Sequence, residues 1–252
     1  MIPIGDDNTG NRFPAWVNIA LIVINVLVFV FLQGLGNNDR FTYAWSTVPQ
    51  EIITGKDVVT PDQTAVDPST GQQVLVPGLQ PTPISVYLTL LTSMFMHGSI
   101  LHIAGNMLFL WIFGDNVENA MGHFRYLVFY LLTGLIASLA QVYATVAFGG
   151  NTLIPSLGAS GAISGVLGGY IVLFPHRRVR VLLFNFLTVV PAIVAIGVWF
   201  VFQLVSGLGG LGGSSAGGVA YAAHVGGFVA GLALVRIFAF GRNNDEFDQV
   251  NW

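Results

Sequence analysis

The chain has 252 residues, of which 54% are hydrophobic and only 8% are charged. Soluble domains carry about 25% charged residues, so this composition, with a mean hydropathy of +0.72, indicates a membrane protein. It excludes a disordered chain and a nucleic-acid-binding protein. The net charge of −3 is too small to indicate an ionic partner, and the absence of cysteine excludes disulfides and thiolate metal sites.

Six apolar segments are candidates for membrane-spanning helices, which need about 20 residues each. We expect them at 15–33, 100–113, 126–148, 157–174, 181–204 and 219–240. The first has neither the basic start nor the cleavage site of a signal peptide, so it should remain as a helix. The fifth contains Pro191, which a membrane helix tolerates when neighbouring groups satisfy the freed carbonyl. The sequence therefore predicts an all-α membrane protein, a bundle of six transmembrane helices.

The remaining segments are polar or too short to span a bilayer. A long first extracytoplasmic loop, 34–96, is polar up to about residue 82, and its apolar part, 86–96, indicates an interfacial or re-entrant piece. A Gly/Ser linker is expected at 206–218. We therefore divide the chain into an N-terminal segment, 1–14, a six-helix domain, 15–240, and a tail, 241–252.

The basic residues orient this bundle. Of the nine lysines and arginines, only Arg40 and Lys56 fall on the side opposite to the termini. Basic residues gather on the cytoplasmic side of membrane proteins, so both terminal segments are predicted to be cytoplasmic. The compact six-span core leads us to expect a bacterial plasma membrane.

Polar side chains enter three of the predicted spans at one depth. Spans two, four and six run in the same direction, and near their starts they carry His97, His102, Asn106, Ser160 and His224. Ionisable groups inside a membrane are costly and mark functional sites by default. We expect these five residues to lie together in the outer half of the bilayer.

The stretch GASGAISG, 158–165, places Ser160 among glycines at the start of span four. Small residues let membrane helices pack closely, and serine is common among them, so packing alone is one interpretation. The other is a nucleophile. His224 shares a helix face with Gly227, and Gly161 adjoins Ser160, so close packing of the two helices would bring the hydroxyl to the histidine. His224 would then act as general base.

Span two would supply the oxyanion hole of such a site. His102 and Asn106 are four residues apart on one helix face, and both can donate hydrogen bonds beside the Ser160 backbone N–H. They could equally well only bond neighbouring helices. His97 is off that face and is expected to order the loop. A metal site is disfavoured because no carboxylate or cysteine joins the histidines and HExxH is absent.

Four motifs in order resemble the rhomboid family of intramembrane serine proteases. They are HGSILHIAGN (97–106), GDNVENAMG (114–122), GASG (158–161) and AHVGGFVAG (223–231). The resemblance implies a rhomboid-type bundle with Ser160 as nucleophile, His224 as general base, and His102 and Asn106 in the oxyanion hole. It gives Glu118 a structural role and places Gly158 in the nucleophile motif.

The resemblance also implies single-span membrane proteins as substrates, cut near the outer face, with membrane lipids as surroundings and neither cofactor nor metal. The chain departs from the family pattern at Ser164, where members often have tyrosine under the histidine, and at Ser46, where the first loop often has arginine after tryptophan. The insertion at 54–81 has no counterpart that we recognise.

Two other functions remain as hypotheses. A non-catalytic rhomboid-like binder or escort would typically lack the serine or the histidine. A transporter would have internal repeats, and the sequence shows none.

Overall fold

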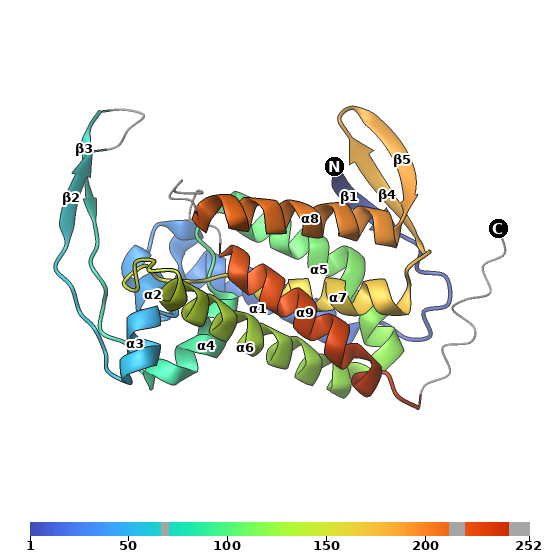
Figure 1. The fold of residues 1–252 in the computed structure, drawn as a ribbon, viewed down its shortest axis with the longest axis horizontal. Coiled ribbons are helices and arrows are strands. Elements are labelled where there is room, and N and C mark those ends of the chain that lie inside the picture. The colour runs from blue at the N-terminus through green and yellow to red at the C-terminus, as the bar shows by residue number, and fades with distance from the viewer. Residues whose placement is uncertain (67–70, 212–219, 242–252) are drawn as a thin grey trace.

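The structure is a computed structural model that describes residues 1–66, 71–211 and 220–241 (Figure 1). The larger helices are α1 (Trp16–Leu27), continued by the π-helix η1 (Val28–Leu32), α5 (Ile100–Met121), α6 (His123–Ala147), α7 (Ser160–Leu173), α8 (Ala192–Leu211) and α9 (Tyr221–Phe238). Short helices are η2 (Gly34–Gly36), α2 (Asp39–Ala44), α3 (Pro49–Thr54), η3 (Val86–Leu88), α4 (Thr89–Thr92) and η4 (Ser93–Phe95). The strands are β1 (Ile2–Asp6), β2 (Gln63–Val66), β3 (Gln73–Val76), β4 (Arg178–Leu183) and β5 (Phe186–Pro191).

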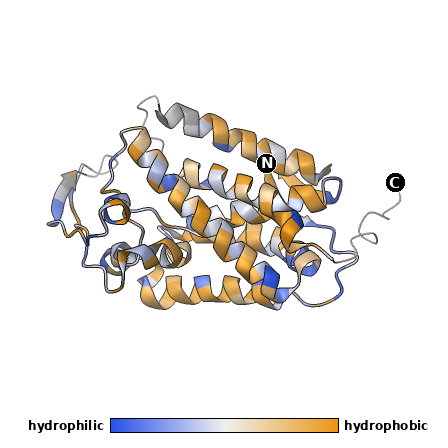
Figure 2. Cartoon of the chain, turned by 60° about the horizontal axis from the view of Figure 1, so that its bottom comes forward, coloured by the Kyte–Doolittle hydropathy of each residue, from blue (hydrophilic) through white to orange (hydrophobic). Residues whose placement is uncertain are grey.

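Apolar helices dominate the described part of the chain, as the composition predicts. Three of them, α5, α6 and α9, are long and apolar enough to cross a bilayer. The segments 16–32, 160–173 and 192–207 are apolar but shorter. Much of the helix ribbon is coloured as hydrophobic (Figure 2), and many large hydrophobic side chains on these helices are exposed, which suits a lipid environment. The protein is therefore a membrane protein, and helix length alone supports three of its six expected spans.

The expectation of an all-α fold is wrong, because the described residues include five strands. Strands β1, β4 and β5 form one antiparallel sheet in the order β1-β4-β5, and β2 pairs with β3 inside the insertion at 54–81. The fifth helix accordingly begins at Ala192, not at 181. A continuous apolar run does not by itself distinguish a strand from a helix. Pro191 ends β5 and interrupts no helix.

Other boundaries also differ from the expected ones, and α5 continues to Met121 where the expected span ended at 113. Helix α8 extends to Leu211, so the first six residues of the expected 206–218 linker are helical, and 212–218 lie outside the described residues. The tail is described only at Gly241. Segment 86–96 forms the short helices η3, α4 and η4, in keeping with a piece that does not cross the bilayer.

Helix α7 lies at the centre of the bundle, and its residues from Gly161 to Tyr170 are all buried. Glycines make this possible because α7 and α9 cross with backbone against backbone. A Cβ added at Gly231 would lie 2.0 Å from the carbonyl oxygen of Gly165, and one at Gly227 would lie 2.1 Å from that of Gly161. With 14 residues, α7 is about 21 Å long, which is shorter than the bilayer core of about 30 Å.

A buried polar cluster ties the N-terminal strand to the opposite end of α7. Asp6 Oδ2 accepts hydrogen bonds from Tyr170 Oη at 2.6 Å and from Asn116 Nδ2 at 2.8 Å. Burial raises the pKa of Asp6 to about 7, with a further rise from Asp115, against the lowering effects of the Tyr170 hydrogen bond and of Arg177. The strand is thus fixed to α5 and α7 at the end of the bundle away from Ser160.

Candidate active site

Ser160 and His224 are in direct contact across the α7–α9 crossing. Ser160 is the first residue of α7, and its Oγ lies 2.7 Å from Nε2 of His224. His224 sits in the first turn of α9 and is only 8% exposed. The glycine contacts of Gly227 and Gly231 hold the two backbones at the separation that this hydrogen bond needs. A serine and a histidine at this distance have the geometry of a nucleophile and its general base.

Gln203 holds the other side of the histidine ring. Its Oε1 lies 2.8 Å from Nδ1 of His224, and its side chain is 8% exposed. An amide oxygen only accepts hydrogen bonds, so this contact places a proton on Nδ1 and leaves Nε2 free to accept from Ser160. The rings of Trp199 and Tyr221 flank the imidazole at centroid distances of 6.1 and 6.3 Å.

Gln203 was not predicted from the sequence. The available signal was its position: a lone polar residue in the apolar stretch 192–205, near the end of a helix that runs opposite to α9. Polar residues within membrane helices mark functional sites, and this one reaches the level of His224.

Ser164 does not contact the histidine. Its hydroxyl is buried and donates to the carbonyl oxygen of Ser160 at 2.6 Å, a bond back to the preceding turn that serines commonly make in helices. Ser164, at the position where the resemblance led us to expect a tyrosine, therefore does not support the ring of His224, and Gln203 contacts that ring from another helix.

The histidines and the asparagine of the HGSILHIAGN motif form a connected group. Asn106 Nδ2 lies 2.9 Å from Nε2 of His97, and the rings of His97 and His102 meet edge to face at 5.1 Å. Gln33, at the end of the first helix, accepts from the backbone N–H of His97 and donates to its carbonyl, each at 2.9 Å. His97 is fully buried and links Asn106 to the first helix.

Gly158 lets His102 approach the nucleophile. A Cβ at this position would lie 2.9 Å from His102 Nε2 and 3.6 Å from Ser160 Oγ, and its φ of +122° also favours glycine. Its backbone N–H donates to the Ser93 carbonyl at 2.9 Å, which fixes the segment before α7. The first N–H groups of α7 have no partner within the helix, so Ser160 presents a backbone donor beside the His102 ring.

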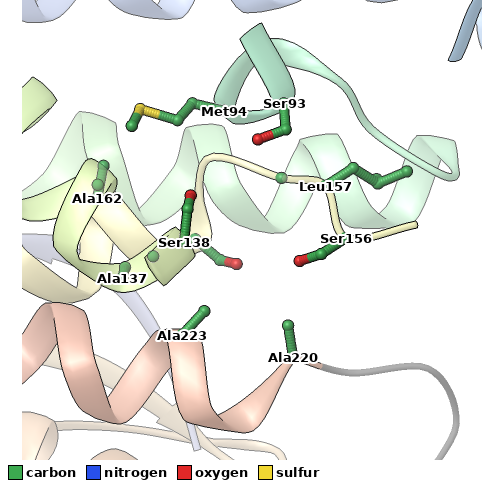
Figure 3. Close-up of a pocket in the computed structure, with 13 residues that line it drawn as sticks. Ser93, Met94, Ala137, Ser138, Ser156, Leu157, Ala162, Ala220 and Ala223 are labelled. Carbon is green, nitrogen blue, oxygen red and sulfur yellow. The ribbon is translucent and has the colours of Figure 1, made fainter. Parts of the chain in front are cut away.

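A small cavity of about 20 Å³ opens beside Ser160. Figure 3 shows its lining, which comes from η4, α6, the segment before α7, and the starts of α7 and α9. Most of the lining side chains are small: Ser93, Ala137, Ser138, Ser156, Ala162, Ala220 and Ala223, with Gly134, Gly158 and Gly161. The space admits about one water molecule or a side chain of similar size.

Glu118 lies far from these groups, at the other end of α5. Its carboxylate accepts from the backbone N–H groups of Val17 at 3.0 Å and Asn18 at 2.7 Å, and it pairs with the His123 ring. These contacts cap the start of α1 and do not reach Ser160. Among the described residues, no group of three or more His, Asp or Glu side chains is arranged to hold a metal ion.

Comparison with known proteins decides the family. The model of the Rhomboid domain matches residues 85–240, more than half of the chain. The chain belongs to the rhomboid family. The match includes α5 to α9, which carry Ser160, Gln203 and His224, together with His97 and Gly158 outside these helices, whereas Gln33 precedes it.

Individual rhomboid relatives match over part of their length. Rhomboid protein 1, mitochondrial, of Saccharomyces cerevisiae is 35% identical over 160 residues, 61% of this chain and 42% of the yeast protein. Rhomboid protease GluP of Bacillus subtilis is 33% identical over 156 residues, 61% of this chain and 27% of GluP. The human presenilin-associated rhomboid-like protein, mitochondrial, is 34% identical over 117 residues, 42% of this chain and 30% of that protein.

This rhomboid chain thus spans less than half the length of each of these three relatives. The names of two of them include mitochondria, and the third is from a bacterium, so the comparison does not favour the bacterial plasma membrane that we expected. The membrane location itself rests on the apolar helices.

Proposed function

We propose that this rhomboid is an intramembrane serine endopeptidase that cleaves single-span membrane proteins near the extracytoplasmic face. The observation that supports this most is the 2.7 Å contact between Ser160 Oγ and His224 Nε2 at the start of α7, where the histidine is buried and the serine is half-buried. Isolated buried polar pairs are costly in a membrane, and packing alone would not require an unprotonated Nε2 beside a hydroxyl.

The proposed reaction uses the two residues in turn. His224 Nε2 takes the proton of Ser160 as Oγ attacks the carbonyl carbon of the scissile bond, and the protonated ring then gives that proton to the leaving amine. Water hydrolyses the resulting acyl-enzyme by the same route, which regenerates the serine. Gln203 acts as a positioning residue, because its acceptor on Nδ1 fixes the tautomer that this sequence of transfers needs.

The oxyanion of the tetrahedral intermediate would be held by the Ser160 backbone N–H, His102 and Asn106. The start of a helix favours negative charge, and His102 Nε2 lies next to Gly158. The Asn106 amide contacts His97, so we propose that it turns from this partner toward the oxyanion or steadies the His102 ring through His97.

The cavity beside Ser160 suggests which substrates fit. Its volume of about 20 Å³ and its lining of alanine, serine and glycine suit a small side chain on the residue that contributes the carbonyl. Because α7 is short, Ser160 lies below the bilayer surface, where a substrate helix must unwind to present its backbone.

The topology proposed for this activity has six spans: the segment 16–32, α5, α6, α7, α8 and α9, with both ends of the chain on the cytoplasmic side. The shorter helix α7 is enclosed by protein, and a membrane tolerates irregular backbone at depth where protein covers it. A bacterial plasma membrane and a mitochondrial membrane are the two locations that fit the relatives' names.

Substitution of the pair tests the function. Ser160→Ala and His224→Ala should each abolish cleavage of a single-span reporter carrying alanine at the cut site, in vesicles that contain the purified protein. Ser164→Ala, which removes a hydroxyl one turn away on the same helix, should retain cleavage. Undiminished cleavage by either of the first two variants would refute the mechanism. Unchanged reporter binding without any cleavage by the wild type would support a binder or escort in its place.

A further inference from the structure

The β4–β5 hairpin, residues 178–191, is an apolar structure that the protease mechanism does not use. Its tip is highly exposed: Phe184 is 87% exposed, Phe186 77% and Leu187 72%. On the inner face of β4, Val179 and Val181 are fully buried, whereas no residue of β5 is buried. The hairpin is therefore anchored at its base and presents a bare apolar tip.

The base of the hairpin is fixed to the ends of two apolar helices. Helix α7 ends at Leu173, only four residues before β4, and α8 begins directly after Pro191. Backbone hydrogen bonds clamp this junction, from Ala192 N to Arg177 O at 2.8 Å and from Ile193 N to Pro175 O at 2.9 Å. If both helices cross the bilayer, the base must lie at the membrane surface.

The hairpin also runs in a direction that keeps it there. In Figure 1 the helices lie side by side along one axis, whereas β4 and β5 rise across that axis at the edge of the bundle. Strands of six residues reach about 20 Å. With α7 and α8 crossing the bilayer, a hairpin of this length and direction would extend over the lipid around the protein and would not project into water.

The turn retains a bulky aromatic residue in a strained conformation. Phe184 has a φ of +52°, in the left-handed region where glycine and asparagine are favoured and a bulky side chain is an outlier. Strain that persists at an exposed position points to a function of the side chain. An aromatic ring that nothing in the fold covers gains from burial in the interfacial region of a bilayer, where such rings concentrate.

Charge at the base complements this placement. Arg178 and Arg180 are exposed, and residues 174–192 include no acidic side chain. Asp7 is close enough to Arg178 to interact with it electrostatically, which still leaves a net positive charge. Basic residues next to apolar ones are typical of segments that bind anionic lipid headgroups and bury their apolar part at the acyl boundary.

We propose that the β4–β5 hairpin is a lipid-binding paddle, with Phe184, Phe186 and Leu187 inserted into the adjacent leaflet and the arginines on anionic headgroups. The proposal rests on the membrane-spanning placement of α7 and α8 in the proposed function. It assigns the hairpin a lipid surface as its partner, and it gives the start of α8 a second anchor besides its contacts in the bundle.

The absence of cysteine allows a direct test by single-site spin labelling. Phe184→Cys is labelled with a nitroxide in the full chain, which is reconstituted into vesicles of equal parts phosphatidylcholine and phosphatidylglycerol. Collision with oxygen, which concentrates in lipid, is compared with collision with a water-soluble nickel chelate. Val201→Cys, 57% exposed on α8, provides the lipid benchmark, and Thr9→Cys, exposed in the N-terminal segment, provides the aqueous one.

The label at 184 should favour oxygen over nickel, as at 201. A ratio like that at position 9 would overturn the proposal, and so would protection from both reagents, which would indicate that a protein or a second copy covers the tip. Phe186→Cys repeats the measurement at the next aromatic residue. An aqueous ratio at 201 would instead refute the span assigned to α8, and loss of proteolysis with a lipid ratio at 184 would refute only the protease.

Discussion

Replacing Gln203 with methionine removes the acceptor on His224 Nδ1 with little change in side-chain volume. In the wild type this acceptor lies 2.8 Å from the ring nitrogen, and both groups are 8% exposed, so water is poorly placed to take its role. The variant should leave the fold and the substrate contacts intact. Without the acceptor on Nδ1, His224 should no longer be held in the tautomer whose Nε2 can accept the Ser160 proton. The protonated ring should also lack its hydrogen-bond partner.

The size of the effect follows from the charge on that ring during the reaction. A hydrogen bond to a charged group is worth about 1.5–3 kcal/mol, and His224 is charged only after it has taken the serine proton. Because about 1.4 kcal/mol changes a rate tenfold, Gln203→Met should lower kcat about 10- to 150-fold. The bond contributes less to substrate binding, so KM should change little.

Cleavage of a single-span reporter in vesicles, followed at several reporter densities, separates kcat from KM. Gln203→Glu keeps an acceptor at the same reach and should retain most of the rate, whereas a purely structural role would make it as damaging as methionine. Val201→Met, on the same helix and facing outward, is the matched control. A kcat for Gln203→Met within about twofold of the wild type would refute the positioning role.

Three further changes test other parts of the structure. Gly231→Ala places a Cβ 2.0 Å from the Gly165 carbonyl oxygen and should push α9 away from α7. The free energy of unfolding should fall by at least about 1–3 kcal/mol, and proteolysis should be lost. The control Gly197→Ala, whose Cβ meets nothing within 4 Å, should keep wild-type stability in thermal unfolding and wild-type activity in the cleavage assay. The pKa of Asp6 is about 7 in the fold against an ordinary 3.8, so the fold binds this proton more tightly than the unfolded chain does, and stability should fall as the pH rises from about 4 to about 7. Asp6→Asn should flatten that decline in melting temperature, and an unchanged slope would contradict the assignment. Glu118→Gln should weaken the cap on α1 by about 1.5–3 kcal/mol and lower the melting temperature, while cleavage at low temperature persists; unchanged stability would count against the structural role.

The helices that carry the candidate site were predictable because their signals are strong and local. Long apolar segments define α5, α6 and α9. Glycines near Ser160 and His224 lie on the same helix faces as these two residues. A helical period of 3.6 residues is enough to predict which side chains meet when such faces pack. The Ser160–His224 contact follows from this pattern once the two helices are placed side by side.

The sheet was not predictable in the same way. Residues 181–191 are apolar and adjoin an apolar helix, so hydropathy alone merges β4, β5 and α8 into one segment. Pairing of β4 with β1 joins residues more than 170 positions apart, and no local pattern reports such a contact. The strand-favouring residues of the sequence VRVLLFNFLTVV were the available signal.

Gln203 illustrates the other limit, since its role depends on which neighbour its helix turns it toward. Its surroundings, WFVFQLV, define no motif, and only the packing of α8 against α9 brings it to His224. The partner of Asn106 is similar: a helix face predicts that Asn106 and His102 point the same way, and not that the amide contacts His97.

Reaction with a fluorophosphonate probe, followed by mass mapping of the modified residue, tests the nucleophile most directly. The probe forms a covalent bond only with a serine that is activated by a base. We expect one modified residue, Ser160, with modification lost in Ser160→Ala and strongly reduced in His224→Ala. Modification at any other residue, or an unmodified Ser160 in protein that cleaves the reporter, would contradict the proposed mechanism.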